Sequence, residues 1–159
     1  MRTFALAIAG MMLAGTLYGQ EMEICGEFYA PWGSSQTEVI RAGAKASLNF
    51  KDINKANEDG VSQVTFLNGN IARIFTLMHG KYVSFSLLHL DPDSAKRDKY
   101  TAKQMQNVLK QVTELDEEGG WIVNCGQTTV KATMETKTGQ AAFRVLSITT
   151  LKELVNSAD

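Results

Sequence analysis

Residues 61–90, VSQVTFLNGNIARIFTLMHGKYVSFSLLHL, contain three apolar runs that are separated by Asn68-Gly69 and by His79-Gly80. Asn-Gly favours a two-residue hairpin turn, and β-rich runs around two such turns predict a three-strand antiparallel meander. The segments before and after the meander are then expected to form helices, a second hairpin and a cross-link that cover or pin this sheet.

The two turns also predict which side chains share a face of the meander. Two-residue loops place Val64 opposite Arg73, and Arg73 opposite Ser86. The face that points away from Arg73 is the expected core, and it carries Ala72, Ile74, Thr76, Val83, Phe85 and Leu87. The other face is an apolar floor with polar groups in it, a candidate binding surface formed by Arg73, Phe66, Phe75, Tyr82, Ser84 and Ser86. A slip of one residue in either turn would exchange the two faces, because side chains alternate along a strand.

More strands and two helices are predicted outside the meander. Residues 121–149 contain a short apolar run, an alternating half-buried strand and, after a turn at Thr138-Gly139, a third strand. The predicted class is α+β: an antiparallel sheet of five to six strands (meander 61–90 plus strands 121–149), with two main helices (about 35–50 and 100–116) packed on it.

The helix over residues 100–116 has the clearest pattern, because its apolar positions keep helical spacing. The stripe consists of Met105, Val108, Leu109, Val112 and Leu115. Leu109 lies at the middle of the stripe and is expected in the core. Leu109→Ala would then lower the free energy of unfolding by roughly 2 to 5 kcal/mol.

The first residues have the layout of a secretory signal peptide. A single basic residue precedes an apolar stretch of 14 residues, 4–17, whereas a membrane-spanning helix needs roughly 20. We expect cleavage after Gly19, so that residues 1–19 are the signal peptide and residues 20–159 form a single globular domain. The expected location is the periplasm or the outside of the cell, without membrane insertion after cleavage.

The charge of the exported part is close to neutral. The signal peptide contains one basic and no acidic residue, so the rest of the chain has 15 Lys and Arg against 17 Asp and Glu. Nucleic-acid-binding domains are usually strongly basic, and no nucleic acid partner is therefore expected.

Cys25 and Cys125 are the only cysteines, and both lie in the exported part. An oxidising compartment makes an intramolecular disulfide the expected state. The bond would close a loop of about 100 residues, for which the chain-entropy model gives on the order of 4 to 5 kcal/mol. Residues 20–33 are expected to form a short strand or extended arm that holds Cys25.

Motifs that would indicate an enzyme are absent: the sequence has no GxSxG, Walker loop, GxGxxG or HExxH. His79 and His89 are the only histidines, and His79 is expected in an exposed turn. His89, Asp91 and Asp93 in HLDPD resemble a metal-ligand cluster, but the proline makes this a turn and Asp93 is a better helix cap. We expect no catalytic residue, no metal and no cofactor.

These observations favour a small exported binding protein, periplasmic, that acts as an inhibitor, immunity protein or adaptor through contact with another protein or an envelope ligand. Two alternatives remain. One is a small envelope hydrolase that uses His89 and Asp91. The other is a structural subunit of an envelope assembly that makes contacts by strand addition at a sheet edge.

Overall fold

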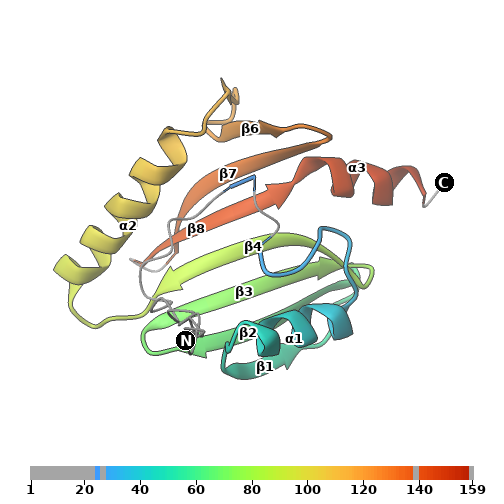
Figure 1. Ribbon diagram of the computed structural model, residues 1–159, viewed down its shortest axis with the longest axis horizontal. Helices are drawn as coiled ribbons and strands as arrows, with labels where there is room; N and C mark the ends of the chain where they lie inside the picture. The colour runs from blue at the N-terminus through green and yellow to red at the C-terminus, as the bar shows by residue number, and fades with distance from the viewer. Residues whose placement is uncertain (1–23, 26–27, 138–139, 158–159) are drawn as a thin grey trace, which may run out of the picture.

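The sheet is the largest element of the structure and contains strands from both halves of the chain. A computed structural model describes residues 24–25, 28–137 and 140–157. Within them, eight strands form one antiparallel sheet in the order β1-β2-β3-β4-β8-β7-β6-β5, and three helices pack against it (Figure 1). The predicted α+β class and antiparallel sheet are confirmed, while five to six strands is too few.

Two meanders make up this sheet, and the pairing of β4 with β8 joins them. The first meander contains β2 (Val61–Asn68), β3 (Ile71–Met78) and β4 (Lys81–His89). The second contains β6 (Trp121–Cys125), β7 (Thr128–Lys137) and β8 (Gln140–Ser147). The strands that the sequence did not predict are the two edges, β1 (Phe50–Asn54) and β5 (Glu114–Leu115). The helices are α1 (Gln36–Lys45), α2 (Ser94–Leu109) and α3 (Ile148–Asn156).

The first turn of the meander is shifted by one residue from the prediction. Asn68 pairs with Ile71, so the loop is Gly69-Asn70, and Phe66 rather than Val64 lies opposite Arg73. Gly69 has a φ of 56°, which suits two-residue turns that need a positive φ at their first central position. The loop keeps its length of two residues and only moves along the chain, so each residue of β3 pairs two positions further along β2. The faces are therefore not exchanged, as they would be by a register slip of one residue.

The second turn is His79-Gly80 as predicted, with positive φ at both residues. Beyond it, however, Leu77 pairs with Tyr82 and Thr76 pairs with Ser84, which leaves Val83 as the extra residue of a bulge. A bulge reverses the alternation of the strand that contains it. The predicted faces are therefore wrong for the far part of β4: Phe85 and Leu87 join the Arg73 face, and Ser84 and Ser86 leave it.

The face that carries Arg73 is covered by residues 28–33, which we call the N-terminal segment. Its rings stack on the sheet, with ring centroids 4.8 Å apart for Phe28 and Phe85 and 4.7 Å apart for Trp32 and Tyr82. Backbone hydrogen bonds of 2.8 Å from Gly33 N–H to Tyr82 O and from Tyr82 N–H to Ser34 O fix its end to β4. The face predicted as a binding surface is thus the main core of the protein.

α1 lies directly on β2, as the alanine-rich sequence allows. Ser35 and Glu38 form a capping box at its start, because the Ser35 side chain accepts from the Glu38 N–H and the Glu38 carboxylate accepts from the Ser35 N–H. A Cβ at Gly43 would overlap the ring of Phe66. Only glycine lets the helix backbone come this close to the sheet.

α2 buries a different side from the predicted one. Gln104, Asn107 and Val108 are buried, whereas Leu109 is 51% exposed. The buried stripe is displaced by one residue, which is about 100° around a helix. The prediction that Leu109 lies in the core is therefore wrong, and the inner side of α2 is largely polar.

Two sequence predictions fall outside the described residues. They are the signal peptide at 1–19 with its cleavage after Gly19, and the turn at Thr138-Gly139.

Of the helices that the structure does describe, none combines the length and the apolar character needed to cross a bilayer.

The orientation of α2 can be tested with a pair of adjacent substitutions. Val108→Ala should lower the free energy of unfolding by about 2 kcal/mol, since a buried methylene contributes about 0.8 kcal/mol and a cavity adds to the loss. Leu109→Ala is the matched control and should change it by less than about 0.5 kcal/mol. Urea denaturation measures both, and the reverse ranking would show that α2 is rotated.

Candidate functional site

Arg73 lies in the core, in the middle of β3 between Phe66 of β2 and Leu87 of β4. Its side chain is 5% exposed. Nε donates a hydrogen bond of 3.0 Å to the Tyr29 hydroxyl, while Nη1 is buried and has no hydrogen-bond partner among the described residues. In the same part of the chain, no carboxylate forms an ion pair with Arg73. The described residues thus offer this buried positive charge one neutral hydrogen bond and no counter-charge.

Polar side chains of α2 lie near this guanidinium. Burial raises the pKa of Tyr100 to about 12, and the positive charge of Arg73 partly opposes that rise. The Gln104 side chain hydrogen-bonds the Tyr100 hydroxyl, but Gln104 Oε1 is buried without a partner. Asn107 Nδ2, one turn further along α2, is also buried without a partner. The polar layer thus has buried groups that its own side chains do not satisfy.

The chemistry of Arg73 suits an anion. Burial of a guanidinium has a desolvation cost of several kcal/mol, which a neutral hydroxyl compensates only in part. A carboxylate or phosphate oxygen would accept from the guanidinium in a charge-assisted hydrogen bond, which is about twice as strong as a neutral one. The site could therefore hold an acidic group.

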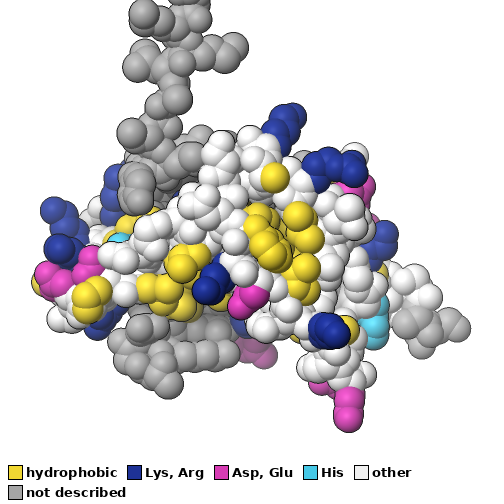
Figure 2. Space-filling view, turned by 90° about the horizontal axis from the view of Figure 1, so that it is seen from below, with side chains coloured by type: hydrophobic (Ala, Val, Ile, Leu, Met, Phe, Trp, Pro, Cys, Tyr) yellow, Lys and Arg dark blue, Asp and Glu magenta, His cyan; other side chains and the backbone are white. Residues whose placement is uncertain are grey.

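Next to this site, a cavity of about 560 Å³ runs along α1, and we call it the α1 groove. It is lined by Tyr29, Glu38, Arg41, Ala42, Lys45 and Ala46. Seen from the side on which α1 and β1 lie, the surface shows two groups of hydrophobic side chains with a basic and an acidic side chain between them (Figure 2). Tyr29 belongs to both places, because it lines the α1 groove and its hydroxyl accepts a hydrogen bond from Arg73.

The predicted binding residues are only partly brought together. Phe66, Phe75 and Tyr82 share the face of Arg73, but their side chains are fully buried in the aromatic core. Ser84 and Ser86 point to the other side of the sheet, where the Ser84 hydroxyl donates to Val145 O at 3.0 Å. Of the predicted set, Arg73 alone has a buried side-chain atom without a hydrogen-bond partner among the described residues.

The site also contains residues that the sequence analysis missed, namely Tyr29, Tyr100 and Gln104. The run FYAPW, residues 28–32, was a usable signal, because three aromatic residues close to a cross-linked cysteine need an apolar surface. Tyr100 and Gln104 carried no signal, since polar positions on a helix usually face solvent.

His89 and Asp91 have structural contacts. His89 stacks on Tyr100 with ring centroids 4.8 Å apart, and its Nδ1 accepts from the Asp91 N–H at 3.4 Å. The Asp91 carboxylate accepts from the Asp93 N–H and from Asn70 Nδ2, and the first of these bonds is the main reason that its pKa is lowered. Asp93 caps α2 as predicted. Within the described part of the chain, no three His, Cys, Asp or Glu side chains are grouped as a metal site would need.

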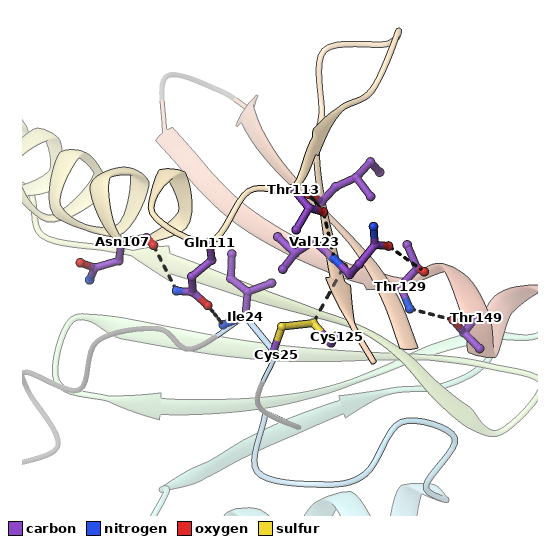
Figure 3. Close-up of a disulfide and its surroundings, with 11 residues drawn as sticks. Ile24, Cys25, Asn107, Gln111, Thr113, Val123, Cys125, Thr129 and Thr149 are labelled. Carbon is purple, nitrogen blue, oxygen red and sulfur yellow. Dashed lines mark hydrogen bonds between the residues drawn. A yellow bond between two sulfur atoms is a disulfide. The ribbon is translucent and has the colours of Figure 1, made fainter. Parts of the chain in front are cut away.

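The predicted disulfide between Cys25 and Cys125 is confirmed, with Cα atoms 5.1 Å apart (Figure 3). It joins Cys25, which precedes the N-terminal segment, to the end of β6. Beside it, the Ile24 N–H donates to Gln111 Oε1 at 2.9 Å, which links this part of the chain to the residues after α2. These two contacts fix the chain just before Tyr29.

Comparison of the chain with protein-family models, with curated proteins and with solved structures finds no match in any of the three. Function is therefore inferred from the geometry of the site.

The contact between Tyr29 and Arg73 can be measured with a double-mutant cycle. Tyr29→Phe leaves Arg73 Nε without an acceptor, so it should lower the free energy of unfolding by about 1 to 3 kcal/mol. In an Arg73→Met background the same change should cost only a few tenths of a kcal/mol, because no buried donor remains. Equal costs in the two backgrounds, measured by urea denaturation, would show that the hydrogen bond does not hold Arg73.

Proposed function

We propose that this protein is a small exported binding protein that holds an acidic group of its ligand at Arg73. The observation that carries the proposal is the buried guanidinium, whose Nη1 has no hydrogen-bond partner and which pairs with no carboxylate among the described residues. A protein that needed Arg73 only for its fold would be more stable with an apolar residue of similar volume. This cost supports a use of the charge in recognition.

The ligand would supply a carboxylate or phosphate. Such a group can come from an acidic side chain or chain end of another protein, as in an inhibitor, immunity protein or adaptor, or from a small envelope ligand. Both sources offer the same oxygen atoms to the guanidinium. Export to the periplasm is supported by the disulfide and by the signal-peptide pattern of residues 1–19.

Strand addition is a second candidate, and one observation favours it. β1 is an edge strand of the sheet, and all five of its residues are exposed, including Phe50 at 51%. A strand of an envelope partner could pair with this edge. Size-exclusion chromatography that shows a strict monomer at all concentrations would count against a structural subunit.

The hydrolase hypothesis has weaker support, because His89 and Asp91 bond within the turn between β4 and α2.

The anion site predicts a specific dependence of stability on acids in solution. At fixed ionic strength, acetate or phosphate should raise the free energy of unfolding of the wild type, by about 2.7 kcal/mol at 100 times the dissociation constant. Arg73→Met should remove this dependence, and should itself stabilise the protein in a buffer without either acid. Lys152→Met, which removes an exposed cation of α3, is the control and should keep the wild-type dependence.

Two outcomes would contradict the proposal. One is the same acid dependence in the wild type and in Arg73→Met. The other is a large loss of stability on Glu27→Gln that disappears in the Arg73→Met background. Glu27 lies outside the described residues, and this second result would show that the counter-charge of Arg73 belongs to the chain itself.

A further inference from the structure

Tyr29 separates Arg73 from the α1 groove. Its hydroxyl accepts from Arg73 Nε at 3.0 Å, and Tyr29 is also one of the residues that line the groove. The guanidinium therefore lies one side chain behind a cavity of about 560 Å³. That volume falls within the range of small-ligand pockets, roughly 300 to 1,000 Å³.

The backbone at Tyr29 is unusual. Tyr29 has a φ of 63°, and the Ala30 N–H donates to Phe28 O at 2.7 Å across it. Tyr29 is thus the central residue of a γ-turn with positive φ, a rare and strained form. Strained residues of this kind occur often at ligand clamps and switch regions.

Tyr29 lies between two residues whose rings stack on β4. Phe28 stacks on Phe85 and Trp32 stacks on Tyr82, while the Tyr29 ring packs edge-on or tilted against Phe75 and Phe85, with ring centroids 5.9 Å and 6.1 Å apart. All three aromatic residues of the N-terminal segment are half-buried. A rotation of the Tyr29 side chain would give up its own two ring contacts and open a path from the α1 groove to Arg73, while Phe28 and Trp32 stay stacked.

The groove is basic. Arg41 and Lys45 are one turn apart on α1, are both exposed, and form no ion pair with any described residue. Glu38 lies in the same wall, but its carboxylate accepts from the N–H and the hydroxyl of Ser35, at 2.7 Å and 2.8 Å. Glu38 is thus bonded by the helix cap, which is the main reason that the pKa of its carboxyl is lowered, and the positive charges of Lys81 and Arg41 make smaller contributions. Ala42 lies between the two cations and keeps the floor of the groove apolar.

We propose that the α1 groove is a second subsite, and that the ligand is a small elongated acid with two anionic groups joined by an apolar chain. One acidic group binds Arg73 after Tyr29 has rotated away, and the other binds Arg41 and Lys45. The inference rests on the proposed function, because it needs Arg73 as an anion site. It adds the class of the ligand and the role of Tyr29 as a gate.

Linear dicarboxylates test this arrangement, because two cationic subsites at a fixed separation select one chain length. Dissociation constants are measured by calorimetry for the series from succinate to sebacate, and for monocarboxylates of the same lengths. We expect one dicarboxylate length to bind at least ten-fold more tightly than its monocarboxylate. The double variant Arg41→Gln with Lys45→Gln should lose that advantage and keep the monocarboxylate affinity, while Lys152→Gln should keep both.

The possible failures are distinguishable. If monocarboxylates bind at Arg73 but no dicarboxylate is preferred, the second subsite is wrong and the proposed function stands. If no carboxylate binds, or if Arg73→Met binds as tightly as the wild type, both are wrong.

The role of Tyr29 as a gate has its own test. Tyr29→Gly, which suits the positive φ, should speed association of the preferred dicarboxylate at least ten-fold. An unchanged association rate would overturn the gate.

Discussion

The stacking of the N-terminal segment on the sheet is the contact on which the rest of the structure depends. Phe28 and Trp32 lie on Phe85 and Tyr82, and this contact turns a half-open sheet face into a core. Ordering a short extended segment on the sheet costs conformational entropy, which opposes the contacts of its three aromatic rings. A covalent constraint on the segment reduces that cost. The disulfide of Cys25 supplies that constraint from the other meander.

The N-terminal segment also determines how deeply the charge of Arg73 is buried. An arginine in an uncovered strand would keep its charge in water at little cost. With residues 28–33 packed over this face, the guanidinium is almost entirely buried, and its energy depends on which oxygens face it. The Tyr29 hydroxyl provides one neutral oxygen, and it is carried by a turn with positive φ. The stability of the buried charge and its proposed role in recognition thus depend on the same side chain.

Sequence reasoning could predict what depends on local patterns. The turns at Asn68-Gly69 and His79-Gly80 predicted the meander, and two exported cysteines predicted the disulfide. It could not predict the bulge at Val83, because nothing in YVSFSLL marks an unpaired residue, and every face assignment beyond the bulge then failed. It also misplaced Leu109, since apolar side chains on two sides of α2 permit more than one stripe. The site itself arises from a contact between residues 44 positions apart, Tyr29 and Arg73, which no local pattern encodes.

The central claim is that Arg73 is an anion site, and crystals grown in sodium bromide test it most directly. Bromide scatters anomalously, so a difference map locates the ion without reference to any assumed ligand. The account predicts an anomalous peak within hydrogen-bonding reach of Arg73 Nη1 in the wild type, and no peak there in Arg73→Met. A map in which Nη1 instead bonds a carboxylate of the chain, with no bromide beside it, would contradict the account.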